Sequence, residues 1–448
     1  MTSSTALAAA LAADTDHVAC FDRDGTERRW PELVTAASRV HDQLAHSPAR
    51  RWVLNLDGAF EFAAAILGCW AARKTAVLAP QTLLAGVPPI DFDGVIEPIG
   101  SLTTARERLV WERLPETRQR IQEVAPSAQL VLYTSGSTGV PKEVQREVHN
   151  VEAELAVLET LWGDGLGQAR FFTTVSHRHV YGMLFGVLWP LLNRRPFANF
   201  LLAYPEQLAD GRGNAQALVS SPALLKRIGH LPRGSTSWRA VFSSGGLLPA
   251  SAAADTEDVL GVCPVEVLGS TETSGVAWRS RSVHKACFRV MPRVETRLGP
   301  NDLLEARSPF TGQPDWLTMG DRVRFAGDGS FELLGRGDHL AKIEDKRVSL
   351  AEIERYLLET PWIKDAACLA LEDGRRQYVG AILQLNAEGA AEIARVGRRP
   401  FNEGLKAVLR GRIDGVAVPR KFRYVDSIPV DTQGKRQPAM IERLFGKR

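Results

Sequence analysis

The stretch "LVLYTSGSTGVPKEV", residues 130–144, joins an apolar run to a turn of small residues. Residues 130–133 predict a buried strand, and residues 134–140 are hydroxyl-bearing residues and glycines followed by one valine. Backbone N–H groups in such a loop can bind an anion, and the cation Lys142 follows. The Walker pattern is absent, because the glycines have the wrong spacing to Lys142 and no Ser or Thr comes after it. An ordinary surface turn is the alternative, but the whole string favours a phosphate site of a non-Walker type.

Strand-like and helix-like segments alternate beyond this loop. Residues 145–162 and 180–192 have apolar residues at helical spacing, with a strand-like run between them. This order predicts an α/β domain with largely parallel sheets, in which ligands bind beyond the carboxyl ends of strands. The small-residue loops at 134–140, 243–246 and 269–275 all follow strands, so we expect them to converge on one site.

The C-terminal part has a different pattern, with an α+β arrangement that starts after Gly335. We predict a large domain over residues 1–335, made of mainly parallel α/β subdomains plus a small β-rich subdomain. A small mobile α+β domain follows over residues 336–448, with the hinge at Asp338. It carries 22 Lys and Arg residues against 16 Asp and Glu residues, so it is the basic part of the chain. Within it we expect a hairpin at 341–348, helices at 350–359 and near 400–413, and strands near 365–371, 377–385 and 421–427.

Composition limits the class of protein. The 448 residues are 44% hydrophobic and 24% charged with a net charge of +3, which gives no indication of a nucleic-acid surface. Five scattered cysteines without a C-x-x-C motif argue against a disulfide framework or zinc ribbon and favour a reducing cytosol. The apolar run at 180–192 is too short to span a membrane, and the N-terminus lacks the basic region of a signal peptide. We therefore expect a cytoplasmic protein.

Five segments occur in the order found in one known family: "YTSGSTGVPKEV" (133–144), "LGSTETSG" (268–275), "LTMGDRVRF" (317–325), "LGRGDHLAKIEDKRVSLAEIE" (334–354) and "PVDTQGKRQP" (429–438). Together they resemble the signatures of the adenylate-forming superfamily, which includes acyl- and aryl-CoA synthetases, adenylation domains of peptide synthetases, and luciferases. The resemblance implies attack of a carboxylate on the α-phosphorus of ATP with release of pyrophosphate. Both reactants are anionic, so such a site must neutralise charge and align them.

The resemblance also implies roles for single residues. Thr271 and Glu272 would act at the α-phosphate and Mg²⁺, with the Glu272 carboxylate as metal ligand. Asp321 and Arg336 would contact the ribose, and Lys435 would bridge the reacting carboxylate, the α-phosphate and the ribose. Standing alone, Glu272 would be read as a solvated carboxylate, Asp321 as a turn-capping residue and Lys435 as a solvated lysine. The remaining nucleotide-binding residues would be Thr134, Ser135, Gly136, Ser137, Thr138, Gly139, Lys142, Gly245 and Gly269.

The segment "VSHRHVYGMLFGVLWPL" indicates an acid pocket. His177 and His179 form an H-x-H pair, but without a third ligand nearby a metal site is disfavoured. By resemblance His179 would lie beside the acyl carboxylate, and His177 would be structural. Small hydroxyl-bearing walls favour an aromatic acid of hydroxybenzoate type, although simple packing explains these serines nearly as well. The expected pocket residues are His179, Tyr181, Gly182, Ser220, Ser221, Ser243, Ser244, Gly246 and Ser270.

Two residues depart from the family pattern. Leu268 stands where an aromatic residue usually stacks on adenine, and Asp345 stands where many members have Gly in the hairpin near the thiol channel. The chain is also short and resembles ligases of aryl polyene and xanthomonadin-type pigment clusters, which load an acyl carrier protein. A basic small domain would attract an acidic carrier protein, but an ordinary solvated helix face is equally consistent with the arginines.

The resemblance implies a second half-reaction. The small domain would swing about Asp338, withdraw Lys435 and present the hairpin from Lys342 to Arg347 for thioester formation. Free CoA is the alternative acceptor. A non-catalytic ATP-sensing protein with the same fold is the alternative of another class, and a luciferase-like oxygenase has no distinct support.

Overall fold

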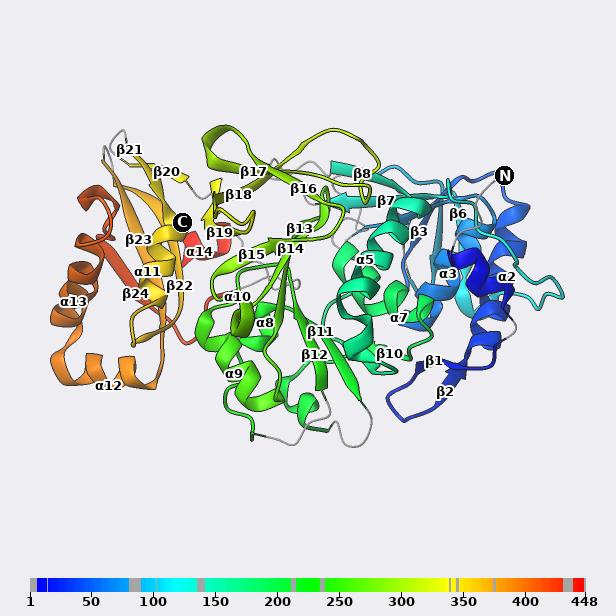
Figure 1. Cartoon of the computed structure of the whole chain (residues 1–448), viewed down its shortest axis with the longest axis horizontal. Coiled ribbons are helices and arrows are strands. Elements are labelled where there is room, and N and C mark those ends of the chain that lie inside the picture. Colours follow the sequence, from blue (N-terminus) through cyan, green and yellow to red (C-terminus); the bar gives the residue numbers. More distant parts are fainter. Residues whose placement is uncertain are drawn as a thin grey trace.

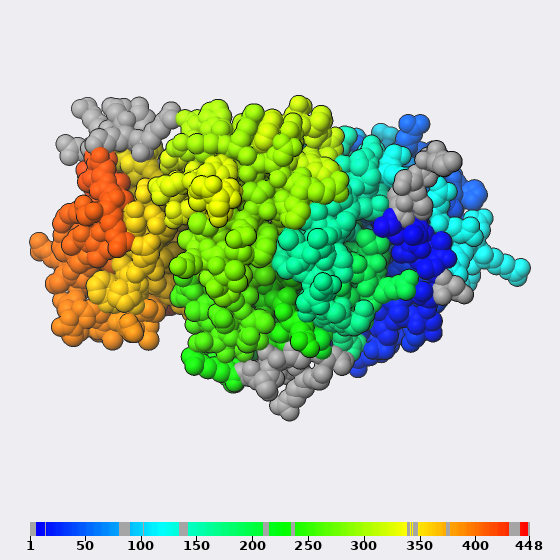
Figure 2. Space-filling model, viewed as in Figure 1, coloured from blue at the N-terminus to red at the C-terminus, as the bar shows by residue number. Residues whose placement is uncertain are grey.

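The computed structural model describes residues 6–13, 15–79, 90–101, 103–134, 142–210, 215–233, 238–337, 340–343, 346–373, 376–429 and 438–446. Figure 1 shows an elongated molecule with the N-terminal elements at one end and the C-terminal elements at the other. In the space-filling view of Figure 2, the residues from about 350 onward gather at the same C-terminal end.

A six-stranded sheet of the described residues carries the opening stretch of the sequence. Its strands are all parallel except for the antiparallel pair of β7 and β8 at one edge. In sheet order they are β6 (Glu107–Val110), β5 (Gly94–Glu97), β3 (Arg51–Leu54), β4 (Thr75–Leu78), β7 (Gln129–Thr134) and β8 (Lys142–Glu147).

A second sheet of thirteen described strands runs through the middle of the molecule (Figure 1). Its strands from β13 through β1 pair in parallel, and the remaining pairs are antiparallel. The sequence therefore predicted the α/β class and the β-rich part correctly. In sheet order the strands are β16 (Glu295–Leu298), β17 (Leu303–Arg307), β18 (Leu317–Phe325), β19 (Phe331–Arg336), β15 (Cys287–Val290), β14 (Ser274–Ser280), β13 (Val265–Ser270), β12 (Trp238–Ser243), β11 (Gln216–Ser220), β9 (Arg170–Thr173), β10 (Phe197–Leu201), β1 (Val18–Phe21) and β2 (Glu27–Arg29).

Two helices pack between these sheets. α3 (Ala59–Ala71) contacts β3 and β4 of one sheet and β10 of the other, which explains why it is apolar around almost its whole circumference. α5 (Val148–Leu166) likewise contacts β8 and β12. The other helices of this part are α1 (Ala6–Ala12), α2 (Trp30–Ala45), α8 (Pro222–Leu225), α9 (Ala250–Leu260) and α10 (Arg281–His284), with 3₁₀ turns at Trp111–Arg113, Pro205–Asp210 and Pro300–Asp302.

The apolar run at 180–192 is not one regular α-helix. It consists of α6 (Val180–Met183), a π-helical segment (Leu184–Leu188) and α7 (Trp189–Leu192). Pro190 lies in the first turn of α7, where its missing N–H is best tolerated. No described helix is long and apolar enough to span a bilayer.

The C-terminal elements pack on a core of their own. Gly397, with φ of +85°, separates α12 from α13, so the predicted helix near 400–413 is preceded by one that we did not predict. A 3.1 Å ion pair between Lys226, which follows α8, and Asp365 of β22 joins this part to the rest of the molecule. The elements are β20 (Leu340–Ile343), β21 (Lys346–Ser349), α11 (Leu350–Leu358), β22 (Ile363–Asp373), β23 (Arg376–Leu385), α12 (Ala387–Val396), α13 (Arg398–Arg410), a 3₁₀ turn (Gly415–Ala417), β24 (Lys421–Tyr424) and α14 (Pro438–Arg443).

Candidate active site

The hairpin of β7 and β8 holds the two ends of the glycine-rich loop. Thr134, the last residue of β7, pairs in register with Lys142, the first residue of β8, and Lys142 is exposed. The two ends of the loop are therefore held side by side. Five of the expected phosphate-binding residues lie outside the described residues: Ser135, Gly136, Ser137, Thr138 and Gly139.

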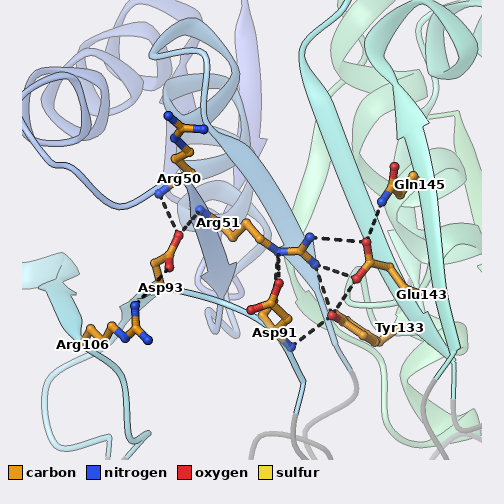
Figure 3. Close-up of polar contacts among 8 residues, drawn as sticks. All are labelled: Arg50, Arg51, Asp91, Asp93, Arg106, Tyr133, Glu143 and Gln145. Carbon is orange, nitrogen blue, oxygen red and sulfur yellow. Dashed lines mark hydrogen bonds and ion pairs between the residues drawn. The ribbon is translucent and has the colours of Figure 1, made fainter.

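A polar network holds the β7–β8 hairpin next to the ends of the glycine-rich loop, as Figure 3 shows. Arg51 Nη2 donates to Glu143 Oε2 at 2.8 Å and to the Tyr133 hydroxyl at 3.1 Å. The Tyr133 hydroxyl in turn donates to Glu143 Oε2 at 2.9 Å and accepts from the Asp91 N–H. Burial alone would raise the pKa of Glu143, but hydrogen bonds from Arg51, Gln145 and Tyr133 outweigh it and lower that pKa. The residues next to both ends of the loop are thus held by one side chain of β3.

The turn between β13 and β14 presents Thr271 and Glu272. Ser270 Oγ and Thr273 Oγ1 lie 3.0 Å apart, and each accepts a hydrogen bond from the other residue's N–H, so the turn closes on itself. A Cβ on Gly269 would lie 2.3 Å from the carbonyl oxygen of Ser274, so only glycine fits there. Thr271 and Glu272 are half-buried.

Arg146 connects this turn to the hairpin. Its Nη2 donates to the carbonyl oxygen of Thr271 at 2.7 Å and to that of Glu272 at 2.8 Å. Arg146 lies in β8, four residues after Lys142, and its side chain is buried. Two segments that the sequence assigned to phosphate binding are therefore in direct contact through a residue that the sequence reasoning missed.

Asp321 and Arg336 lie opposite each other in the antiparallel strands β18 and β19. Asp321 is buried, whereas Arg336 is exposed. A Cβ on Gly320 would lie 2.6 Å from Nη2 of Arg336, so the guanidinium passes over this glycine. The two residues expected at the ribose are thus neighbours.

The two histidines of the H-x-H pair have different surroundings. His177 is buried, its Nε2 lies 2.8 Å from the carbonyl oxygen of Leu56, and its ring packs on Phe62. Burial lowers the pKa of His177 to about 4, so it is neutral at physiological pH. His179 is the half-buried N-cap residue of α6, and no group of three His, Cys, Asp or Glu side chains arranged for a metal occurs in the described part of the chain.

The first turn of α6 packs closely on the preceding backbone. A Cβ on Gly182 would lie 2.2 Å from the carbonyl oxygen of Ser176, so the helix could not approach this closely with a larger residue. The hydroxyl of Tyr181 is buried and has no hydrogen-bond partner of normal geometry in the described structure. Burial raises the pKa of Tyr181, and the nearby backbone of Ser220 only partly opposes this shift.

The serines expected in the pocket lie at the carboxyl ends of parallel strands. Ser220 and Ser243 are paired in register and buried. The Ser220 hydroxyl lies 2.9 Å from Thr174 Oγ1, and the Ser244 hydroxyl donates to the carbonyl oxygen of Val267 at 2.9 Å. The Ser243 hydroxyl has no partner in the described structure. The hydroxyls of Ser220 and Ser244 therefore have structural hydrogen bonds within the protein.

The neighbouring loop residues are more open. Ser221 caps α8, and Gly245 and Gly246 are exposed. Gly245 has a φ of +88°, a conformation that favours glycine. Leu268, the departure at the expected adenine position, is half-buried and packs against the apolar cluster of the β-rich part. Three further predicted residues, Lys435, Asp338 and Asp345, lie outside the described residues.

Sequence reasoning missed Arg51, Tyr133, Glu143 and Arg146. Residues 145–162 were read as one helix, which would place Arg146 on a solvated surface. The signal that could have corrected this is the pattern of residues 142–147, in which buried Val144 and Arg146 alternate with more exposed residues, as in a strand.

The structure places the β7–β8 hairpin, the turn with Thr271 and Glu272, and the Asp321–Arg336 pair in the same α/β framework. Residues 89–302 match the AMP-binding enzyme family. The match includes the β7–β8 hairpin, α6 and the Thr271–Glu272 turn, and it ends before Asp321. Within these residues, the match agrees with the resemblance that the five signatures indicated.

Relatives of known sequence and structure cover most of the chain. A 4-coumarate–CoA ligase of Cereibacter sphaeroides is 27% identical over 331 residues, covering 70% of this chain and 71% of the relative. The ATP-bound RpMatB-BxBclM chimera B3 superposes with a TM-score of 0.83 at 18% identity, covering 98% of this chain and 99% of that one. A benzoate CoA ligase from Burkholderia xenovorans LB400 gives a TM-score of 0.79 at 19% identity, with 97% and 98% covered. At these identities the structural likeness establishes the fold.

Proposed function

We propose that this protein is an AMP-forming acid–thiol ligase that activates an aromatic carboxylic acid with ATP. The observation that carries the proposal is the contact between the glycine-loop hairpin and the Thr271–Glu272 turn through Arg146. Transfer of the adenylyl group requires that the attacking carboxylate and the departing pyrophosphate be aligned on opposite sides of the α-phosphorus, as one new bond to it forms and the bond to pyrophosphate breaks. The AMP-binding match over residues 89–302 supports the same reaction.

The described residues fit ATP and Mg²⁺. A buried Asp321 carboxylate suits the ribose hydroxyls, and the exposed Lys142 ammonium suits a phosphate. Glu272 offers a carboxylate oxygen, the kind of ligand Mg²⁺ prefers, and Mg²⁺ commonly takes its other ligands from phosphates and water. Mg²⁺ would supply charge neutralisation on the phosphates. Lys435 would neutralise the charge that develops between the carboxylate and the α-phosphate.

An aromatic acid of hydroxybenzoate type is the proposed substrate. Support comes from the relatives, one of which acts on 4-coumarate and another on benzoate by their names. The buried Ser243 hydroxyl has no partner in the described structure, and the Tyr181 hydroxyl has only the nearby backbone of Ser220, without normal hydrogen-bond geometry. A polar group on a bound acid would satisfy such hydroxyls. His179, at the start of the same helix as Tyr181, is the proposed neighbour of the reacting carboxylate.

An acyl carrier protein is the proposed acceptor, with free CoA as the alternative. The basic C-terminal part favours an acidic partner. Several of its basic side chains already have acidic neighbours, because Arg395 pairs with Glu392 and both Lys406 and Arg410 contact Glu403. This reduces the charge available for docking, so the acceptor has to be decided by experiment. Formation of CoA thioester without loading of a phosphopantetheinylated carrier protein would exclude the carrier.

Thioester formation requires the proposed rotation of residues 336–448 about Asp338. The 3.1 Å pair of Lys226 and Asp365 would have to open in that movement. Gly335, with φ of +120°, directly precedes the proposed small domain, and a Cβ on it would lie 2.5 Å from that of Ala351. Position 335, beside the proposed hinge, therefore requires glycine.

A screen of pyrophosphate release over benzoates, cinnamates and fatty acids tests the function. We expect acid-dependent release with a hydroxylated benzoate, and loss of at least about 100-fold in Lys435→Ala with ATP binding retained, because a preorganised charge is removed. Near-normal ATP–pyrophosphate exchange in Lys435→Ala would contradict the mechanism. Absence of release with every acid would favour the ATP-sensing alternative.

A further inference from the structure

A buried seam behind the Thr271–Glu272 turn contains two charged side chains. Arg146 of β8 and Glu154 of α5 are 4% and 2% exposed. With Ser274 they are the polar members of a space whose other lining residues are apolar: Leu130, Leu132, Val151, Val180, Met183, Leu184 and Phe310. Burying charge in such a place is costly unless each group is well paired, so the seam calls for an explanation.

The two side chains hold opposite ends of the same turn. Arg146 Nη2 donates to the carbonyl oxygens of Thr271 and Glu272, at 2.7 Å and 2.8 Å. Glu154 Oε1 accepts from the N–H of Gly275 at 2.8 Å. Every residue from Thr271 to Gly275 is thus within one or two residues of a buried charged anchor.

The hydrogen bonding of Arg146 is incomplete, which is unfavourable for a side chain that serves only to stabilise the fold. Nε of Arg146 is buried and has no hydrogen-bond partner in the described structure. Burial lowers the pKa of Arg146, and the charges of Glu154 and Glu272 only partly oppose this. Burial also raises the pKa of Glu154, against hydrogen bonds from Gly275 and Ser274. Both charges therefore retain an uncompensated cost of burial.

We infer that Arg146 and Glu154 are positioning residues that fix the Thr271–Glu272 turn relative to the β7–β8 hairpin. The inference rests on the proposed function, because it assigns the two connected segments to one bound MgATP. Arg146 is suited to this role by its place in the chain: β8 begins at the end of the glycine-rich loop, so the strand that leaves the loop also carries the anchor of the turn. Neither residue touches the nucleotide in this account.

The variant Arg146→Lys tests the inference. It keeps a positive charge beside Glu154, but a single ammonium on a shorter side chain does not reproduce the fork that reaches both carbonyls. We expect the affinity for ATP in the presence of Mg²⁺ to fall roughly tenfold, with a higher Mg²⁺ concentration needed for half-saturation, because residues that orient ligands typically act on that scale. Calorimetric titration of the full chain with ATP, at several Mg²⁺ concentrations and without acid, measures this.

Arg195→Lys is the matched control. Arg195 is also 4% exposed and contacts backbone carbonyls and a glutamate of α5, namely Glu159, away from the Thr271–Glu272 turn. We expect Arg195→Lys to lower the thermal stability while the ATP titration remains that of the wild type. Equal ATP titrations for Arg146→Lys and wild type, or equal losses in both variants, would overturn the inference.

A second pair of variants covers the case in which Arg146→Lys does not fold. Glu154→Gln keeps an acceptor for the Gly275 N–H and removes the charge, and Glu159→Gln is its control on the same helix. We expect weaker Mg²⁺-dependent ATP binding, by roughly two- to threefold, in Glu154→Gln alone, since a hydrogen bond to a neutral acceptor is the weaker one. Unchanged binding in Glu154→Gln would then reject the inference.

The test separates this inference from the proposed function. Wild-type protein that binds MgATP but releases no pyrophosphate with any acid would refute the ligase and leave the positioning role to be decided by the titrations. Wild-type protein that does not bind ATP would refute both. Normal pyrophosphate release together with unaffected ATP binding in the variants would refute the positioning role only.

Discussion

Two buried arginines lie along α5, and they are used in different ways. Arg195 binds Glu159 through both terminal nitrogens, at 2.6 Å and 2.7 Å, while its Nε donates to the carbonyl oxygen of Gly167 just beyond the end of the helix. Arg146, near the start of the helix, donates to the carbonyls of Thr271 and Glu272 and leaves Nε without a partner. The first closes a helix end, and the second reaches across to another element.

The neighbouring glutamates reflect this difference. Burial alone would raise the pKa of Glu159, but hydrogen bonds from Arg195 and Trp189 outweigh it, so its pKa lies below the ordinary value. The pKa of Glu154 is raised by burial. Removing one partner of a well-paired buried ion pair is strongly destabilising, whereas a charged anchor with a residual burial cost is better explained by what it positions. The two ends of one helix thus provide an internal comparison for separating stability from function.

Removing the satisfied pair should have the largest effect on stability. Arg195→Met is expected to lower the free energy of unfolding by about 2–3 kcal/mol at neutral pH, because several charge-assisted hydrogen bonds are lost together. Urea denaturation followed by far-UV circular dichroism measures the change. ATP binding of the folded variant should be unaffected. A loss below about 0.5 kcal/mol would mean that the pair is not the stabilising member of the comparison.

The two glutamates should respond to pH with opposite signs. The lowered pKa of Glu159 gives stability above its ordinary pKa of 4.5, and this stability is lost as pH falls through the folded-state value. The raised pKa of Glu154 gives stability that is present below 4.5 and is lost as pH rises through the folded-state value.

Variants with a neutral glutamine at either position test these opposite pH dependences of stability. Relative to wild type, Glu159→Gln should be least stable at neutral pH and approach wild type as pH falls. Glu154→Gln should gain in relative stability as pH rises. Unfolding free energies measured in urea from about pH 4 to pH 8 provide both curves, and curves of the same slope would remove the physical basis of the comparison.

The partly exposed network of Arg51, Tyr133 and Glu143 should make the smallest contribution to stability. The Arg51 side chain is 21% exposed and that of Arg195 only 5%, so solvent screens the Arg51–Glu143 interaction more than the Arg195–Glu159 interaction. Arg51→Met is expected to cost about 1 kcal/mol or less at neutral pH. A double-mutant cycle with Glu143→Gln measures the coupling, which should vanish at a pH below the lowered pKa of Glu143. A coupling above about 2 kcal/mol would place this network with the buried pairs.

Periodicity and small-residue loops were sufficient to predict the α/β class and the segments around the site. The strands that end at residues 134, 243 and 270 are present, and the segments that follow the second and third of them lie among the described residues. What periodicity could not provide is the partner of each charged side chain. Arg146 was assigned to a helix because residues 145–147 directly precede apolar residues at helical spacing, while hydrogen bonding to β7 keeps them in a strand.

Other differences have equally local causes. α12 was missed because its sequence, "AEGAAEIARV", contains a glycine and few large apolar residues, and its start depends on the Asn386 side chain accepting from the Gly389 N–H. The expectation that His177 is structural, made because His179 suited the place beside the carboxylate, agrees with its burial. The buried Ser243 hydroxyl, which has no partner in the described structure, is a property of three-dimensional packing that the sequence pattern does not show.

The π-helical segment at Leu184–Leu188 has an evolutionary consequence. A π-turn accommodates one more residue than the same length of α-helix, so a change of one residue in chain length can be absorbed within it. The first turn, with Tyr181 and Gly182, and the last turn, with Trp189, can each keep their own surroundings across such an event. Descendants of a common ancestor can therefore differ by one position between these turns, and homologous residues on its two sides have to be matched independently.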